Sequence, residues 1–329
     1  MDYFQTQEAI QFIKTDFEKN LSKKLNLLRV SAPKFLIANT GLLDDLAGTQ
    51  KPVSFKVKFL KEDIEIVHSL AKWKRLILGE FKFPIGVGLY TDMDAIRKDE
   101  DVDSTHSVYV DQWDWEKVIT KEQRNIKFLK KIVKQIYSSM YKTKLKLNKK
   151  YKQLEYTIPK DIHFIHSVDL QKLYPKLTPK EREDKITEQH GAVFIIGIGA
   201  DLSDNKPHDI RATDYDDWST IENGKPGLNG DILVWDKVSG KALELSSMGI
   251  RVDKDALLFQ LKEKNEIHKL KLDYHKKIIS NKIPLSIGGG IGQSRLSMFI
   301  LEKAHIGEVQ SCVWPKGLIT KFKNKGVIL

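Results

Sequence analysis

The segment from residue 230 to residue 253, GDILVWDKVSGKALELSSMGIRVD, restricts the possible folds more than any other part of the chain. It contains two strand-like runs joined by a short turn at KVSG, which predicts a β-hairpin and hence an antiparallel strand pair. Its second half nevertheless ends in polar and small residues, where a strand of a central sheet should bury its side chains. The hairpin therefore raises the question of what Asp231, Glu244, Ser246, Ser247 and Arg251 do.

Helices are predicted in several stretches, and over 4–25 and 118–152 the apolar residues at every third or fourth position predict one buried face. The predicted ranges are about 4–25, 69–78, 179–189, 253–278 and most of 118–152. The last of these is rich in lysine, and a nucleic-acid-binding face is conceivable there. A solvated lysine face over a packed apolar stripe is the simpler interpretation, which we adopt.

Strands are predicted from three further patterns. Residues 53–59 alternate apolar and polar side chains, residues 106–116 are β-branched and aromatic, and residues 192–200 form an apolar run. Hairpins with scattered helices, and no regular strand–helix–strand alternation, predict an α+β fold with a mixed, mainly antiparallel sheet flanked by helices. We expect one domain over residues 1–329, because no repeat or linker interrupts the chain.

The composition narrows the classes of partner. The 55 basic and 44 acidic residues give a formal charge of +11, which favours anionic partners without choosing among them. The single cysteine, Cys312, excludes an internal disulfide and a multi-cysteine metal site, and it fits a reducing compartment. The N-terminus has no apolar signal core and no apolar run could span a bilayer, so we expect a cytoplasmic protein with no membrane partner.

Two glycine-rich stretches lack the standard nucleotide-binding patterns. GIGADL at 197–202 has no third glycine at the dinucleotide spacing, and GGGIGQSR at 288–295 has no lysine followed by serine or threonine. The second stretch instead offers bare backbone followed by Arg295 early in a helix. Such an arginine can bind a phosphate and lay its guanidinium group on an aromatic base. The alternative is a tightly packed crossing from strand to helix.

The hairpin contains charged residues that could bind a ligand. If its strands pair, Asp231 and Glu244 could approach each other as oxygen ligands of Mg²⁺, and Arg251 could clamp a carboxylate. Buried charges cost several kcal/mol unless they are paired or bound. A ligand therefore accounts for them, with a structural ion-pair network as the alternative. Arg97, before an acidic loop, is either a second phosphate-binding group or a surface residue.

Taken in order, these segments resemble the catalytic core of class II aminoacyl-tRNA synthetases, and within that class the aspartyl enzymes. LNLLRVSAPKFL is similar to the first motif, a dimer-interface strand ending at Pro33. IRKDEDVDSTHSVYVDQWDWE is similar to the second motif and aligns Gln112, Asp114 and Glu116 with its strand. ELSSMGIRV resembles the aspartyl signature that ends in arginine, and GGGIGQSRL resembles the third motif.

The whole chain is more closely similar to the ammonia-dependent asparagine synthetase (aspartate–ammonia ligase) family. The runs that carry the resemblance are IVHSLAKWKR, THSVYVDQWDWE, DYDDWST, GLNGDILVW, ELSSMGIRVD and GGGIGQSRL. The resemblance implies ATP-dependent conversion of L-aspartate and ammonia to L-asparagine, AMP and pyrophosphate through a β-aspartyl-adenylate. It also implies Mg²⁺ as cofactor, a homodimer and no nucleic-acid partner.

Motif matching assigns expected roles in nucleotide binding and catalysis. Arg97 would contact the α-phosphate, Arg295 the γ-phosphate and the adenine face, and Asp231 and Glu244 would hold Mg²⁺. The hairpin between these two acids is longer than in the aspartyl enzymes, which favours Glu244 over Asp231 as a ligand. The expected ATP-binding residues are Arg97, Ser107, Val110, Asp231, Glu244, Gly292 and Arg295. The expected catalytic residues are Arg97, Arg295 and Asp44.

The same matching assigns an aspartate site. In the aspartyl enzymes the arginine that matches Arg251 grips the side-chain carboxylate, whereas asparagine synthesis needs that end to react. We therefore expect Arg251, with Lys74 and Gln112, to hold the α-carboxylate. Candidates for the substrate ammonium or the incoming ammonia are Asp44, Asp114 and Asp214. Polar contacts are expected from Ser69, Ser107, Ser246 and Ser247, with packing roles as the alternative. SSMG replaces a glycine run, so the pocket floor should be narrower.

Two other functions compete with this one. The chain could be a synthetase relative that transfers activated aspartate to RNA or protein, or a silent regulatory relative. A silent relative should have lost Arg97, Glu244 or Arg295, and all three are present. The ligase hypothesis requires that these three residues line one common cavity.

Overall fold

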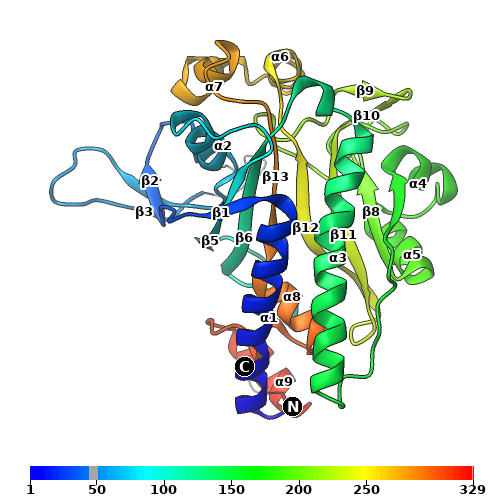
Figure 1. Cartoon of the computed structure of the whole chain (residues 1–329). Helices are drawn as coiled ribbons and strands as arrows, with labels where there is room; N and C mark the ends of the chain where they lie inside the picture. Colours follow the sequence, from blue (N-terminus) through cyan, green and yellow to red (C-terminus); the bar gives the residue numbers. More distant parts are fainter. Residues whose placement is uncertain (44–50, 328) are drawn as a thin grey trace.

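A large central sheet organises the molecule. The computed structural model describes residues 1–43, 51–327 and 329. It contains an eight-stranded sheet in the order β1-β5-β6-β13-β12-β11-β8-β7 (Figure 1). The outermost pairs at each edge, β1 with β5 and β7 with β8, are parallel, and the inner pairs are antiparallel. The predicted α+β fold with a mainly antiparallel, helix-flanked sheet is confirmed.

The strands of the central sheet are spread along the whole chain. They are β1 (Leu27–Arg29), β5 (Gly88–Ile96), β6 (Tyr109–Val118), β7 (His163–His166), β8 (Ala192–Ile196), β11 (Asn229–Asp236), β12 (Lys241–Ile250) and β13 (Ser286–Gly292). A small three-stranded sheet has the order β2 (Phe35–Ile37), β4 (Ile64–Ile66), β3 (Ser54–Phe55). A two-stranded sheet pairs β9 (Ile221–Glu222) with β10 (Lys225–Pro226).

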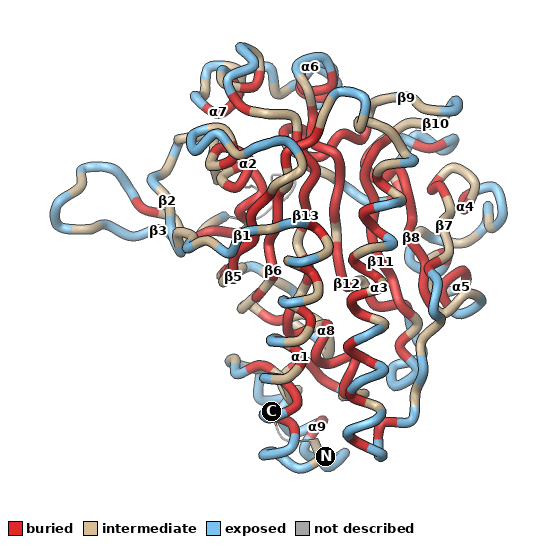
Figure 2. Tube along the Cα trace, in the orientation of Figure 1, coloured by how far each residue is buried: buried red, intermediate tan, exposed pale blue. Residues whose placement is uncertain are grey.

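The strand predicted over 53–59, with one buried face, is wrong. Only Ser54–Phe55 is a strand, and Phe59 is 85% exposed. The reason is that β2, β4 and β3 form a small sheet that projects from the body, so most of this segment faces solvent (Figure 2).

Helices cover the central sheet. They are α1 (Tyr3–Leu25), α2 (Ala71–Glu80), α3 (Ile126–Lys150), α4 (Ser167–Leu173), α5 (Pro179–His190), α6 (Lys254–Glu263), α7 (Asp273–Ile279), α8 (Gln293–Ile300) and α9 (Lys316–Lys323). The continuous helix predicted over 253–278 is wrong, because α6 ends before Asn265, whose φ of 57° lies in the left-handed region. Within the described ranges, no helix is both long enough and apolar enough to cross a membrane.

The two faces of the central sheet differ in chemistry. On one face Trp113, Trp115 and Ile287 belong to the main apolar core with α1 and α3, which lie side by side across the sheet (Figure 1). Alternation along β6 directs Gln112 and Asp114 to the other face. Residues of β6 therefore complete the core on one side of the sheet and form a polar site on the other.

Candidate active site

A cavity of about 320 Å³ lies on the polar face of the sheet, against β6, β12, β13 and the start of α8. It brings together residues that are far apart in the sequence. Of the residues expected from the sequence, those that line it are Arg97, Ser107, Val110, Gln112, Glu244, Ser246, Ser247, Gly292 and Arg295. The cavity thus contains the three residues that the ligase hypothesis required to lie together.

A β-bulge in β12 determines which residues of the hairpin face the cavity. Ser247 pairs with Asp231 and Ser246 with Ile232, whereas Glu244 pairs with Leu233. Leu245 is therefore an extra residue, and it packs in the apolar core. Without the bulge, Glu244 and Ser247 would point to opposite faces, because strand side chains alternate. The bulge allows both to line the cavity.

The two arginines reach the cavity from different elements. Arg97 directly follows β5, and its Nη2 lies 3.4 Å from the carbonyl oxygen of His68. Arg295 lies in the first turn of α8 and donates bonds of 3.3 Å to the carbonyl oxygens of Thr105 and Glu244. Carbonyl groups do not neutralise a guanidinium charge, so Arg295 presents a positive group to any anion in the cavity.

A buried polar cluster fixes the start of α8. Asp111 accepts hydrogen bonds from the backbone N–H of Ser294 at 3.0 Å and from its hydroxyl at 2.8 Å. Gln310 donates to the same hydroxyl at 3.1 Å and accepts from the hydroxyl of Ser107 at 2.6 Å. The sequence analysis missed Asp111 and Gln310. Asp111 lies on the core face of β6, whereas the residues predicted from this strand, Gln112 and Asp114, lie on its polar face. Gln310 is an isolated polar residue that belongs to no motif.

Bare backbone in β13 makes room for Gln112. Gly290 lies opposite the site-facing part of β6, and a Cβ atom on it would come within 2.2 Å of Gln112 Oε1. Glycine at this position leaves the space that the Gln112 amide occupies, and a Cβ atom there would displace that amide. The glycine-rich stretch noted in the sequence provides a floor across which Gln112 extends.

Lys74, Asp114 and Arg251 lie in a buried charge network beside the cavity and are not part of its wall. Lys74 donates to Asp114 and, at 3.0 Å, to the carbonyl of Trp115. Arg251 donates to Glu116 at 3.0 and 2.7 Å, and to Asp216. Burial alone would lower the pKa of Arg251, but Glu116 and Asp216 raise it well above its ordinary value. For Lys74 burial prevails, and its pKa is lowered.

The remaining residues expected at the aspartate site have other surroundings. Asp214 is buried and accepts from Lys72 at 2.7 Å, and its carboxylate lies 3.0 Å from His275 Nε2. Burial alone would raise the pKa of Asp214, but Lys72 and His275 bring it well below its usual range. The Ser69 hydroxyl accepts from the backbone of Ala71 at 3.4 Å, at the start of α2. Asp44 lies outside the described residues.

Asp231 is paired with an arginine that the sequence analysis missed. Arg211, which lines the cavity, donates from Nη2 to Asp231 Oδ2 and at 2.7 Å from Nη1 to Asp209. Within the part of the chain that is described, the buried Oδ1 of Asp231 has no hydrogen-bond partner. Burial raises the pKa of Asp231 to about 7, opposed by Arg211 and reinforced by Glu244. The only sequence signal for Arg211 is its position beside the acidic stretch DYDD.

The donor set fits a divalent cation that is mostly bound by other ligands. An orphaned carboxylate oxygen on Asp231, with Glu244 nearby, offers the oxygen donors that Mg²⁺ prefers. Among residues 1–43, 51–327 and 329, no group of three or more histidine, cysteine, aspartate or glutamate residues could hold a metal ion. Phosphate oxygens and water would therefore have to complete the coordination of Mg²⁺ here.

The architecture is that of the class II aminoacyl-tRNA synthetase catalytic core. Asparaginyl-tRNA synthetase from Pyrococcus horikoshii, solved with asparaginyl-adenylate, superposes with a TM-score of 0.69 over 94% of this chain and 70% of its own, at 15% identity. At that identity the likeness concerns the fold. The sequence model of aspartate–ammonia ligase matches residues 4–326. The chain belongs to the aspartate–ammonia ligase family, which confirms the resemblance seen in the sequence.

Relatives of this chain cover almost its full length. The aspartate–ammonia ligase of Parabacteroides distasonis is 54% identical over 327 residues, which are 99% of this chain and 95% of the relative. That of Bacteroides thetaiotaomicron is 55% identical over 320 residues, covering 97% and 93% of the two chains.

Proposed function

We propose that this chain is a ligase that makes L-asparagine from L-aspartate, ammonia and ATP, and that it releases AMP and pyrophosphate. Its family and the name borne by its relatives support the overall reaction. The observation that carries the proposal is the shared cavity of Arg97, Glu244 and Arg295, since these groups suit a nucleotide triphosphate bound beside an amino acid.

The reaction needs an activated carboxylate, because a carboxylate oxygen is a poor leaving group. In the proposed first step the β-carboxylate of aspartate attacks the α-phosphate of ATP, and the bond to pyrophosphate breaks. In the second step ammonia attacks the acyl carbon of β-aspartyl-adenylate, and AMP leaves. Negative charge develops in both steps and must meet fixed cations. Arg97 would serve the α-phosphate, and Arg295 the γ-phosphate and the adenine face.

Asp231 and Glu244 are the residues proposed to hold Mg²⁺. When bound, the ion would neutralise charge on the phosphates. Arg211 keeps the Asp231 carboxylate in place through the bond to its Oδ2, and the other oxygen remains for a cation. Ser107, Val110 and Gly292 complete the proposed nucleotide site.

Aspartate is proposed to bind with its α-carboxylate toward Arg251, Lys74 and Gln112. A guanidinium group has five N–H donors, and the bonds from Arg251 to Glu116 and Asp216 do not use all of them. Ser69, Ser246 and Ser247 are proposed as polar contacts. One of Asp44, Asp114 and Asp214 would accept a proton from ammonium, since only neutral ammonia is nucleophilic.

The remaining proposals concern the setting of the enzyme. The reaction requires no nucleic acid and no membrane, and we place it in the cytoplasm. The segment that resembles the first motif and ends at Pro33 is the proposed interface of a homodimer, and residues 1–329 are proposed to act as one catalytic domain.

Two assays test the reaction. We expect aspartate-dependent exchange of labelled pyrophosphate into ATP without RNA, followed by ammonium-dependent formation of asparagine and AMP. Arg97→Gln should abolish both, whereas Lys185→Gln, at an exposed lysine paired with Glu188 on α5, should leave both unchanged. A requirement for tRNA would support the transfer of aspartate to RNA, and absence of any exchange would support a silent relative.

A further inference from the structure

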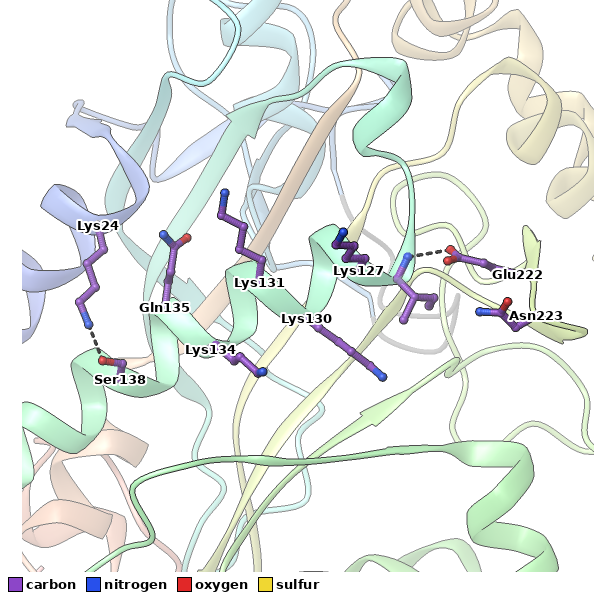
Figure 3. A pocket seen from close by; sticks show the side chains of 10 residues that line it. Lys24, Lys127, Lys130, Lys131, Lys134, Gln135, Ser138, Glu222 and Asn223 are labelled. Atoms are coloured by element: carbon purple, nitrogen blue, oxygen red, sulfur yellow. Dashed lines mark hydrogen bonds between the residues drawn. The ribbon is translucent and has the colours of Figure 1, made fainter.

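A second hollow lies on the opposite side of the sheet from the active-site cavity. Its volume is about 830 Å³, and α3 forms its long wall, with Lys24 of α1 at one end and the β9–β10 turn at the other (Figure 3). We call it the α3 groove and define it by Lys24, Lys127, Lys130, Lys131 and Lys134. Because α1 and α3 cover the core face of the sheet, a ligand in this groove would be separated from the cavity by the sheet itself.

The α3 groove is rich in positive charge, and two of its lysines, Lys130 and Lys134, lie over the Phe164 ring at 5.4 and 5.8 Å from its centre. Helix α3 has nine lysines and no acidic residue. Within the described part of the chain, no carboxylate lies within ion-pair distance of its groove lysines, whereas further along the helix Lys144 lies 2.6 Å from Glu302. The one acid of the groove, Glu222, accepts a hydrogen bond from the backbone of Ile126 at 2.7 Å and so serves the start of the helix (Figure 3).

This arrangement is unfavourable for the helix taken alone. Lys127 and Lys131 are four residues apart, as are Lys130 and Lys134, and like charges at this spacing repel each other. Positive side chains near the N-terminus of a helix also oppose its macrodipole. The excess charge extends to a neighbouring strand, since burial and then the charge of Lys131 lower the pKa of Lys117. A bound polyanion would relieve each of these unfavourable terms.

The shape and the donors of the groove indicate which polyanion fits. Lys127 to Lys134 span about 10 Å along the helix axis at ~1.5 Å per residue, which suits several successive phosphates of a strand. The groove is concave, unlike a flat membrane surface, and Ser138, Gln135 and Asn223 can hydrogen-bond sugar hydroxyls. Lysine is a point charge without a planar fork, which suits phosphate contacts better than the paired contacts that read a base.

We propose that the α3 groove binds the phosphodiester backbone of RNA without reading its sequence, which revises the interpretation of this helix as only a solvated lysine face. The groove lysines supply the cations, and the polar side chains beside them contact the ribose. RNA bound here lies across the sheet from Arg97 and Arg295, so it is not an acceptor of activated aspartate. This site is therefore distinct from the proposed reaction and does not depend on it.

The test measures binding of fluorescein-labelled poly(U), about 20 nucleotides long, by fluorescence anisotropy. For the full chain we expect affinity to fall steeply between about 50 and 200 mM salt, because counterions are released from the RNA. Changing Lys127, Lys130, Lys131 and Lys134 to glutamine should weaken binding at least tenfold at about 100 mM salt, and should flatten the salt slope by about 0.7 per lysine, the value for a single strand. Changing the same four lysines to arginine should preserve binding.

The matched control removes equal charge elsewhere. Lys149, Lys152, Lys160 and Lys176 are exposed, and changing all four to glutamine should alter RNA affinity less than twofold. Equal affinities of the groove and control glutamine variants would overturn the proposal. The proposal would also be overturned if inorganic polyphosphate displaced poly(U) at a far lower phosphate concentration than unlabelled poly(U) does. It would equally be overturned if the groove glutamine variant lost binding to phosphatidylserine vesicles but kept its affinity for poly(U). The groove glutamine variant should melt at or above the wild-type temperature, because it removes like-charge repulsion along α3, and the other variants should melt as the wild type does. All variants should keep the wild-type rate of asparagine formation, and failure of the wild type to make asparagine would leave the RNA result intact.

Discussion

The guanidinium group of Arg251 holds the carboxylate of Glu116 with two nitrogen atoms, Nε at 3.0 Å from Oε1 and Nη2 at 2.7 Å from Oε2. The Ser286 hydroxyl donates to the same carboxylate at 2.6 Å. Burial alone would raise the pKa of Glu116, but Arg251 lowers it, so the carboxylate remains charged. The charge pair with Glu116 therefore fixes the position of Arg251, which we propose to bind the α-carboxylate of the substrate aspartate.

Arg251→Lys should raise the KM for aspartate at least tenfold and change the KM for ATP less than twofold. Lysine keeps the positive charge but loses the paired donors, and a hydrogen bond to a charged group contributes about 1.5–3 kcal/mol. Steady-state kinetics with each substrate varied in turn measure the difference. Arg182→Lys is the control, because the buried Arg182 donates to the carbonyl oxygen of Tyr174 at 3.0 Å outside the cavity and should affect stability alone. Equal loss of both substrates in Arg251→Lys would refute the assignment.

Gly290→Ala should lower kcat/KM for aspartate about a hundredfold, since a Cβ atom would displace the Gln112 amide that lies 2.2 Å from its position. A displacement of about 1 Å at a substrate-positioning group can cost a factor of that size. Gly317→Ala is the matched control, because in the described structure no heavy atom outside its own chain neighbours and helix backbone lies within 4 Å of the added Cβ. An unchanged aspartate KM in Gly290→Ala would show that Gln112 does not position the substrate.

Local patterns in the sequence predicted most of the architecture. The amphipathic helices α1 and α3 and the strand β6 follow from periodicity, because each has one face against the main core. The strand prediction for residues 53–59 was wrong because alternation indicates only that one face of the segment is apolar. Whether a second layer covers that face depends on distant parts of the chain, and here the small sheet projects into solvent.

The site was predictable where it depended on residue type and motif order. Arg97, Gln112, Glu244 and Arg295 were found in this way, and they line one cavity. The bulge at Leu245 could not be predicted, because it depends on a pairing register that the sequence does not contain. Asp111, Gln310 and Arg211 were missed for a related reason, since each acts through a partner distant in sequence.

Asp214→Asn should flatten the acid side of the stability profile. In the folded protein the pKa of Asp214 is below its ordinary value. The contribution of Asp214 to the free energy of unfolding is therefore fully present above the unfolded-state pKa of about 3.9, and it is lost as the pH falls toward the folded-state pKa. Urea unfolding between about pH 5 and 2 should therefore show a steeper loss for the wild type than for the variant.

At neutral pH, Asp214→Asn should lower the free energy of unfolding by about 3–5 kcal/mol, because the variant removes the buried carboxylate that Lys72 and His275 both contact. Asp169→Asn, which breaks a half-exposed pair with Lys225, should change it by less than about 1 kcal/mol. If the acid limbs of the wild type and Asp214→Asn were parallel, Asp214 would not be the group that responds to acid.

Arg211→Gln should weaken ATP binding tenfold or more and change the aspartate KM less than twofold, the opposite of the result expected for Arg251→Lys. Arg211 lines the cavity and is the cation that holds Asp231, so its loss leaves a buried carboxylate beside Glu244. That carboxylate should then lose its position and, with a pKa already raised, a larger share of its charge. The Mg²⁺ concentration needed for half-maximal exchange should rise together with the ATP KM. Titration of the nucleotide-free protein with Mn²⁺, followed by electron paramagnetic resonance, checks the cation site without relying on activity. Unchanged Mn²⁺ affinity and an unchanged ATP KM would together show that Arg211 only pairs with Asp231 and Asp209 to stabilise the fold.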